Sequence, residues 1–172
     1  SIDTLIERIH RPGGQENGDS KYLPALFEND EAYEVFQRRH SQHKVKTKEI
    51  KEAKGPLFLG IDAGSTTTKA ALTDREGSLL YTFYRGNEGS PVDTSRVLLE
   101  EIYSLMPDDA YIAYTVTTGY GEQLIKAAFG ADYGEIETIA HYKAARSFLP
   151  DVDFILDIGG QDIKCFKIRS GA

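Results

Sequence analysis

The sequence predicts an α/β fold in which helices pack on a mixed β-sheet, and two observations support this prediction. From Gly55 onward, apolar runs of strand length alternate with stretches whose apolar residues repeat at helical spacing. The first three strand-like runs are joined by short turns of small and polar residues, whereas the later ones are separated by helical stretches. The predicted order is therefore βββαβαβ, with helices flanking the sheet.

Composition narrows the class of protein before any motif is considered. The chain has 172 residues, of which 40% are hydrophobic and 27% are charged, and its net charge is −7. These values are typical of an ordinary soluble domain. No run approaches the roughly 18 apolar residues that a membrane helix requires, and residues 1–12 do not resemble a secretory signal. The sequence therefore predicts a cytoplasmic protein without a membrane partner.

Cysteine content and charge exclude further classes. The single Cys165 cannot form an intramolecular disulfide framework and provides too few thiolates for a zinc or iron-sulfur site within one chain. A pI near 5.1 argues against a nucleic-acid partner, whose phosphates require clustered Lys and Arg. Small anionic ligands stay possible, because local geometry can hold them.

Charge also divides the chain near Lys54. Residues 1–54 hold ten Lys and Arg against ten Asp and Glu, whereas residues 55–172 hold ten against seventeen. The first part ends in a lysine-rich stretch over 44–54, and its composition favours a linker or surface appendage. One short helix is expected within it, with Asn29 as its N-cap. We therefore expect an appendage followed by one subdomain.

Three strands open the second part. Residues 57–62 form an apolar run that is typical of a buried strand, and the small residues 63–66 turn the chain into a second strand over 67–74. A further turn over 75–77 leads into a third strand over 78–84. Two strands joined by so tight a turn form a hairpin.

The pattern then changes to helices that alternate with strands. Ser90 followed by Pro91 is typical of a helix start. The predicted elements are, in order, a helix from Pro91 up to the break at Pro107, a strand over 111–116, a helix over 123–129, a short strand over 136–139, a helix over 140–149 and a strongly buried strand over 154–158. Residues 162–168 alternate like a further strand, in which Cys165 is expected to be a packing residue.

One arrangement occurs twice: an aspartate directly after an apolar strand residue, followed by a glycine-containing turn. It occurs at Asp62 with Gly64, and at Asp157 with the glycines at 159–160. Glycine lets backbone N–H groups approach an anion closely, and a carboxylate beside such a turn can hold a hydrated Mg²⁺. Lys69 supplies a cation that can neutralise phosphate. The two turns together predict a phosphate-binding site with magnesium.

Each of the two turns also has a simpler explanation. Alone, either could equally be a hairpin connector, with its aspartate as a turn former. The placement argues for a function, because both aspartates follow apolar strand residues, where an unpaired charge is unfavourable. Neither turn matches a phosphate loop of the G-x-x-x-x-G-K-[ST] type, and no G-x-G-x-x-G opens a helix after the first strand. The first turn instead joins strand to strand.

Four segments resemble one family. Residues 60–69, residues 117–121, the segment around His141 and residues 157–164 resemble, in this order, the ATP-dependent activators of 2-hydroxyacyl-CoA dehydratases and the related ATPase subunits of benzoyl-CoA reductases. That family is part of the superfamily of actin, heat-shock chaperones and sugar kinases, whose nucleotide lies between two ribonuclease-H-like halves. The resemblance covers about residues 55–172, and it implies one ribonuclease-H-like half-domain that is truncated at its C-terminus.

The resemblance implies a role for each residue of the two turns. Asp62 and Asp157 would be catalytic carboxylates that hold Mg²⁺, mostly through water, and Gln161 or Asp162 would orient the attacking water. The first hairpin would bind the β- and γ-phosphates of ATP through Gly64, Ser65, Thr66, Thr67 and Lys69. The second phosphate turn would consist of Gly159, Gly160 and Gln161. The cofactors implied are ATP or ADP and Mg²⁺.

The resemblance also implies what lies outside this chain. In the family a homodimer bridges one [4Fe-4S] cluster, and ATP drives a low-potential electron into a CoA-ester dehydratase or reductase. The cluster cysteines lie downstream of the second phosphate turn, so the ligands of the cluster are expected outside this chain. Longer members carry two units in tandem, and residues 22–27 resemble the connection between them. We therefore expect a fragment of a longer protein that works as a dimer or as a tandem pair.

Two other residues leave alternatives open. His141 could sense the nucleotide or contact a partner, or it could be a hydrogen-bonded structural histidine. Tyr120 lies between two glycines and could stack on a ligand or pack on a tight turn.

The leading interpretation is the ATP-binding and ATP-hydrolysing part of an iron-sulfur activator of anaerobic metabolism. One alternative is a sugar kinase of the same superfamily, which would need a catalytic base near the acceptor hydroxyl. Another is a nucleotide-binding interaction module without turnover. Because only the phosphate end of the cleft is expected here, we expect this chain alone to bind ATP weakly and to be inactive.

Overall fold

The computed structural model describes residues 25–42, 44–159 and 163–169. The chain divides into two compact units, residues 1–44 and 45–172, each with its own internal contacts. Within the three described ranges, no helix has both the length and the apolar surface needed to cross a bilayer.

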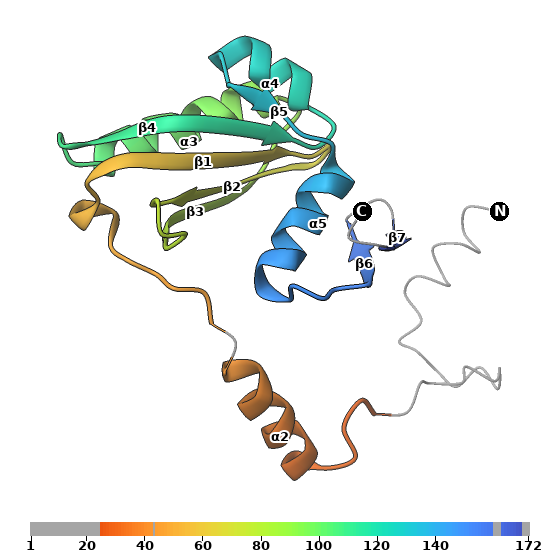
Figure 1. Cartoon of the computed structure of the whole chain (residues 1–172). Helices are drawn as coiled ribbons and strands as arrows, with labels where there is room; N and C mark the ends of the chain where they lie inside the picture. The colour runs from red at the N-terminus through yellow and green to blue at the C-terminus, as the bar shows by residue number, and fades with distance from the viewer. Residues whose placement is uncertain (1–24, 43, 160–162, 170–172) are drawn as a thin grey trace, which may run out of the picture. The chain divides into compact units, whose positions relative to one another are not determined.

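The first unit contains one described helix, α2 (Asp30–Ser41; Figure 1). The side chain of Asn29 caps it by accepting a hydrogen bond from the backbone N–H of Ala32 at 2.9 Å. Its apolar stripe is short: the ring of Phe36 lies 5.1 Å from that of Phe27, and none of the helix residues is buried. The helix predicted after Asn29 is therefore confirmed.

The second unit is built around a five-stranded mixed sheet in the order β3-β2-β1-β4-β5 (Figure 1). Strands β1, β2 and β3 are antiparallel neighbours, whereas β4 runs parallel to β1 and β5 runs parallel to β4. The strands are β1 (Gly55–Ala63), β2 (Thr67–Thr73), β3 (Leu79–Gly86), β4 (Ala110–Thr118) and β5 (Tyr133–Gly134). The predicted α/β class with a mixed sheet is confirmed.

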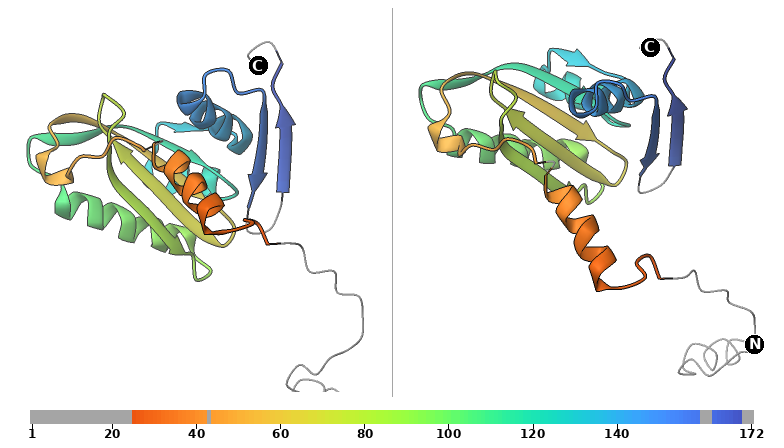
Figure 2. Two further views of the ribbon diagram at one scale, coloured as in Figure 1. Left: turned by 90° about the horizontal axis from the view of Figure 1, so that it is seen from below. Right: turned by 60° about the horizontal axis from the view of Figure 1, so that its bottom comes forward.

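Three helices complete the βββαβαβ order and continue it: α3 (Pro91–Leu105), α4 (Glu122–Phe129) and α5 (Glu137–Phe148). Helix α3 packs against β2 and β3 along one face of the sheet, and α4 packs against β4 (Figure 2). Ser90 caps α3 as predicted, because its hydroxyl accepts a hydrogen bond from the backbone N–H of Asp93 at 3.2 Å.

The core lies between the sheet and helices α3 and α4. Its fully buried apolar side chains include Leu57, Leu59, Ile61, Leu72, Leu98, Ile102 and Ile125. Because side chains alternate across a strand, Asp62 lies on the opposite face of β1 from Ile61. The core therefore holds β1 in place, while the side-chain carboxylate of Asp62, near the end of this strand, stays accessible.

The strand predicted over 136–139 is wrong. Helix α5 begins at Glu137, and the strand β5 ends at Gly134, where it pairs with only two residues of β4. Ile136 and Ile139 are three residues apart, which is helical spacing, and a two-residue strand is too short to show a period of its own.

The strand predicted over 154–158 exists, but its predicted burial is wrong. Strands β6 (Phe154–Ile158) and β7 (Ile163–Lys167) form a separate two-stranded antiparallel sheet. The side chains of Phe154, Leu156 and Ile158 are 54%, 57% and 69% exposed. Cys165, which was expected to be a packing residue, is exposed beside Leu156 on the same face. Within the described residues nothing covers this apolar face.

The second unit begins before Gly55. A short 3₁₀ turn, η1 (Ile50–Glu52), buries Ile50, and Ala53 is buried after it. The backbone N–H of Leu79 donates to the carbonyl of Lys46 at 2.8 Å, which attaches this segment to β3. The boundary expected at Lys54 therefore lies later in the chain than the start of this unit. Ile50 and Ala53 are only two apolar residues in a lysine-rich stretch, which is too few to show a pattern in the sequence.

Candidate functional site

The first predicted turn is the tip of the β1–β2 hairpin. Asp62 and Lys69 are paired across this hairpin, and the Nζ atom of Lys69 lies 3.2 Å from Oδ2 of Asp62. The backbone N–H of Gly64 donates to the carbonyl of Thr67 at 2.9 Å and closes the turn. The two tip residues, 65–66, are exposed. A short polar turn is thus held rigidly beside one carboxylate and one ammonium group.

The segment over 117–121 lies directly against the end of β1. Gly119 has a φ of 87°, and a Cβ at this position would lie 2.5 Å from Oδ1 of Asp62. The backbone N–H of Gly121 donates to the carbonyl of Ala63 at 2.8 Å. Only glycine fits the first of these positions, so the sequence motif and the aspartate are parts of one arrangement. Tyr120 is 92% exposed and packs on no core residue.

The β6–β7 hairpin repeats one cross-strand pairing of the first hairpin. Asp157 is paired across the strands with Lys164, as Asp62 is paired with Lys69. In both hairpins the lysine follows the aspartate by seven positions. Gly159 follows β6, as predicted. The predicted site residues Gly160 and Gln161, and Asp162 beside them, lie outside the described residues.

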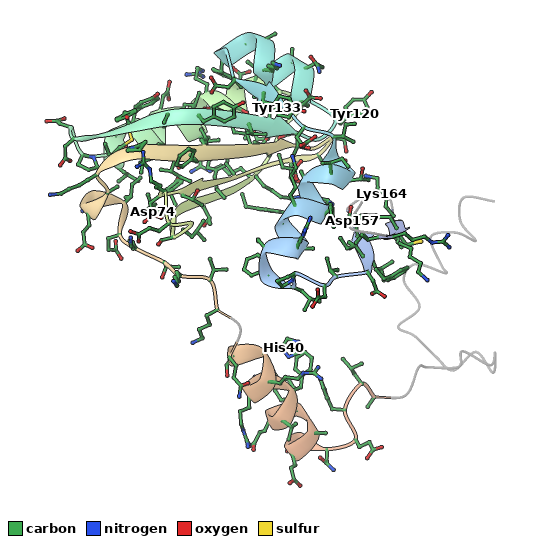
Figure 3. The ribbon with its side chains drawn as sticks, in the orientation of Figure 1. His40, Asp74, Tyr120, Tyr133, Asp157 and Lys164 are labelled. Atoms are coloured by element: carbon green, nitrogen blue, oxygen red, sulfur yellow. The ribbon has the colours of Figure 1, made fainter. Side chains whose placement is uncertain are left out.

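Helix α5 holds this second hairpin through one histidine–carboxylate contact and one ion pair. The Nδ1 atom of His141 lies 3.0 Å from Oδ2 of Asp157, and Nζ of Lys164 lies 3.1 Å from Oε2 of Glu137. Figure 3 shows Asp157 and Lys164 beside this helix. His141 therefore has a hydrogen-bonding partner in the predicted site. Glu137, His141 and Asp157 each offer one ligand atom, and these atoms lie within 4.8 Å of one another.

A further acidic residue, Glu135, lies between β5 and α5. Glu135 is 8% exposed, and its carboxylate accepts a hydrogen bond from the ammonium group of Lys143. This ion pair lowers the pKa of Glu135 and raises that of Lys143, so both groups stay charged at neutral pH. The hydroxyl of Thr118 donates to the carbonyl of Glu135 at 2.8 Å. The end of β4 is thereby joined to the start of α5.

These parts surround one open groove of about 880 Å³. Its lining includes seven of the predicted site residues, namely Asp62, Gly64, Ser65, Thr66, Thr67, Lys69 and Gly159. Tyr120, Glu135, Glu137 and Lys164 line it as well. The β1–β2 hairpin contributes a carboxylate and an ammonium group to the groove, whereas the β6–β7 hairpin contributes Gly159 and the ammonium group of Lys164; Asp157 is not among the lining residues. Such a mixture of charges suits a phosphate chain with a hydrated divalent cation.

Lys164 and Glu137 were not assigned to the site from the sequence alone. The repeated spacing from aspartate to lysine in the two hairpins could have identified Lys164. Glu137 had no such signal, because its residue range was predicted to form a strand.

Comparison with known proteins identifies a family. The sequence profile of the BadF/BadG/BcrA/BcrD ATPase family matches residues 59–172. Over 112 residues the chain is 38% identical to an uncharacterized protein of Methanocaldococcus jannaschii, covering 65% of this chain and 43% of that protein. Over 117 residues it is 32% identical to the (R)-2-hydroxyglutaryl-CoA dehydratase activating ATPase of Acidaminococcus fermentans, covering 66% and 43%. The chain thus spans less than half the length of these relatives.

Two solved structures share the fold. Component A of the (R)-2-hydroxyglutaryl-CoA dehydratase of Acidaminococcus fermentans superposes with a TM-score of 0.56 at 28% identity, over 67% of this chain and 44% of that one. The activator of the 2-hydroxyisocaproyl-CoA dehydratase from Clostridium difficile, with bound ADPNP, gives 0.53 at 29% identity, over 66% and 41%.

Proposed function

Because the chain belongs to the BadF/BadG/BcrA/BcrD ATPase family, we propose that its groove binds the β- and γ-phosphates of ATP. The observation that carries this proposal is that two hairpins, each with an aspartate paired across its strands with a lysine, both contribute residues to the lining of one groove. The similar activator with bound ADPNP supports a nucleotide as the ligand. Phosphoryl transfer needs mainly positioning and charge neutralisation, which these groups supply.

Each wall of the groove has a distinct task in this proposal. The turn over 64–67 offers exposed backbone and hydroxyl groups to phosphate oxygens, and Lys69 neutralises their charge. Gly159 belongs to the second phosphate turn, with Gly160 and Gln161, and Gln161 or Asp162 orients the attacking water.

A divalent cation suits this site, because the half-buried carboxylate of Asp62 lines the groove beside Lys69, and the half-buried carboxylate of Asp157 lies on the second hairpin, whose Gly159 and Lys164 also line the groove. These two residues would hold Mg²⁺, mostly through water. When bound, Mg²⁺ would neutralise charge on the phosphates. His141 orients Asp157 through its Nδ1 atom.

For the whole protein we propose an ATP-dependent activator of a 2-hydroxyacyl-CoA dehydratase or a related CoA-ester reductase. The names of the relatives from Acidaminococcus fermentans and Clostridioides difficile support this kind of partner. We further propose that two such units work together, as a dimer or as a tandem pair in one polypeptide. A [4Fe-4S] cluster would take its ligands from outside this chain, because Cys165 is the only cysteine in the sequence and one thiolate cannot hold a cluster.

The test of the phosphate site is a titration of this chain with Mg-ADPNP, followed by NMR. We expect weak binding, since one half of a cleft is present, and a sub-micromolar affinity would contradict that expectation. Lys69→Met should weaken binding roughly tenfold, because a charge-assisted contact to phosphate is lost. Lys51→Met is the matched control, since Lys51 is an exposed lysine in η1, away from the groove. Equal affinities of the two variants would disprove the role of Lys69.

The test of the activator role uses the complete protein, purified without oxygen. We expect stoichiometric iron and acid-labile sulfide, and an EPR signal of the reduced cluster that changes on addition of Mg-ATP. A protein that is reproducibly free of iron would remove electron transfer from the proposal and leave a sugar kinase or a nucleotide-controlled interaction module.

A further inference from the structure

The loop between β3 and α3 contains one buried amide side chain, that of Asn87, which contacts the β1–β2 hairpin. We call this hairpin, whose turn is proposed to bind phosphate, the phosphate hairpin. Asn87 is 4% exposed. Its Nδ2 atom donates to the carbonyl of Gly64 at 2.8 Å, and its Oδ1 atom accepts from the hydroxyl of Thr68 at 2.7 Å. Its backbone N–H donates to the carbonyl of Thr66 at 2.9 Å. One residue therefore contacts the start, the tip and the far side of the hairpin turn.

The two ends of the amide are not interchangeable. A carbonyl can only accept, so the atom facing Gly64 must be the NH₂ group, and the hydroxyl of Thr68 then donates to the oxygen. Because the site is buried, the loss of either partner would leave an unsatisfied polar group, which destabilises this arrangement. The side chain of Asn87 thus joins Gly64 on one side of the exposed tip to Thr68 on the other.

The loop adopts an unfavourable backbone conformation to present this amide. Glu88 has a φ of 46°, and among the described residues it is the only non-glycine residue with a positive φ. Gly89 follows with a φ of 90°, and the N–H of Ser90 donates to the carbonyl of Asn87 at 2.7 Å. The Glu88 side chain is exposed, so packing does not explain its conformation. Strain of this kind persists where the surrounding structure determines a functional geometry.

We propose that Asn87 is a positioning residue that holds the phosphate hairpin in the conformation that receives the terminal phosphates of a nucleotide. This inference rests on the proposed function, which it extends to a residue outside the groove. Asn87 acts through the backbone of Gly64 and the side chain of Thr68, and it does not touch the ligand. The hairpin tip is then ready to bind before the nucleotide arrives, so no binding energy is spent on ordering it.

Three substitutions separate this role from a general contribution to stability. Asn87→Asp keeps the size and the acceptor for Thr68 but replaces the donor to Gly64 with an oxygen. Thr68→Val keeps the shape of the threonine and removes only its hydroxyl. Tyr81→Phe is the control, because it removes a partly buried hydrogen bond to Glu101 that involves no hairpin residue.

The first experiment needs no nucleotide. It measures amide hydrogen exchange of Gly64, whose N–H closes the hairpin turn. We expect Asn87→Asp to accelerate this exchange about tenfold, which corresponds to about 1.4 kcal/mol, and Thr68→Val to accelerate it less. Tyr81→Phe should leave it unchanged. Unchanged exchange in Asn87→Asp and in Thr68→Val would overturn the inference.

The second experiment compares the affinities of the same variants for Mg-ADPNP, by NMR titration. Asn87→Asp should weaken binding about tenfold, whereas Tyr81→Phe, which removes a hydrogen bond away from the hairpin, should leave the affinity unchanged. An equal loss of affinity in Asn87→Asp and Tyr81→Phe would mean a general structural role and would overturn the inference.

The two experiments also separate this inference from the proposed function. A wild-type chain that does not bind Mg-ADPNP, while Asn87→Asp still accelerates exchange at Gly64, would contradict the nucleotide site and support the positioning of the hairpin. If the wild-type chain and each variant bind Mg-ADPNP with equal affinity, that result would support the nucleotide site and overturn the role of Asn87.

Discussion

Gly119 shows how a single residue shapes the groove. Its positive φ and the carboxylate of Asp62 leave no room for a side chain, since a Cβ would lie 2.5 Å from Oδ1 and 2.8 Å from the carbonyl of Ala63. The end of β4 can therefore approach the end of β1 only because this position is glycine. The same close approach brings the turn that carries Tyr120 to the edge of the groove.

Gly119→Ala should reduce the free energy of unfolding by about 3 kcal/mol, since the backbone strain and the clash with Asp62 add together. Gly130→Ala is the matched control: Gly130 ends α4 with a φ of 67°, and a Cβ added there would have no other atom within 4 Å. The control should lose only about 1 kcal/mol. Urea denaturation measures both values. Equal losses would show that the contact with Asp62 does not prevent a side chain at position 119.

At the level of elements, an ion pair attaches the segment before β1 to the turn between β2 and β3. The Nζ atom of Lys48 lies 2.7 Å from Oδ2 of Asp74, while the other oxygen of Asp74 accepts the backbone N–H groups of Glu76 and Ser78 at 2.9 and 2.8 Å. These contacts, led by that with Lys48, lower the pKa of Asp74 to about 2.

The pKa of Asp74 predicts a pH-dependent contribution to stability. Because the folded pKa of about 2 lies below the ordinary 3.8, the carboxylate stabilises the fold at pH values above 3.8, and this contribution decreases as the pH falls toward 2. Asp74→Asn should therefore lower the free energy of unfolding at pH 6. This loss should become smaller as the pH falls from 3.8 toward 2. Chemical denaturation of both proteins over this pH range measures the difference, and a difference that is independent of pH would contradict the assignment.

The β6–β7 hairpin is an element with little support of its own. Two strands alone are marginally stable in water, and one of its faces is apolar and exposed. The other face is bound to α5 by the pairs of His141 with Asp157 and of Lys164 with Glu137. Lys164 and Glu137, which line the groove, thus also attach the second hairpin to the rest of its unit.

At the level of the whole molecule, the division between Lys44 and Val45 is the principal feature. The helix α2 has no buried residue, whereas Ile50 and Ala53 are part of the core of the second unit. The residues that stabilise the sheet therefore begin before the first strand.

Two truncations test this division. A chain that starts at Val45 should unfold with the same free energy as residues 1–172. A chain that starts at Gly55 should lose about 2–3 kcal/mol, because it lacks the buried side chain of Ile50 and the backbone bonds to Leu79. Thermal and urea denaturation give both values. Equal stability of the two truncated chains would place the start of the unit at Gly55.

Local patterns predicted most of the elements. The strands around Asp62 and the helix after Ser90 are visible as apolar periodicity and cap residues, which depend on near neighbours in the chain. The motif residues of the first hairpin are likewise contiguous, so their joint position at one tip follows from a single turn. The failures occurred where periodicity was too short to read, as in β5, or where burial depends on distant segments, as in β6.

The sequence by itself determined the α/β class, the hairpin turn beside Asp62 and the matching aspartate at Asp157, because each follows from the order of residues along a few turns or strands. The tertiary structure decided which distant groups meet: Gly119 against Asp62, Asn87 beneath Gly64, and His141 beside Asp157. These contacts join residues that are far apart in the chain, and their distances depend on how strands and helices pack. No local pattern of residues encodes such a distance, so only the folded chain reveals it.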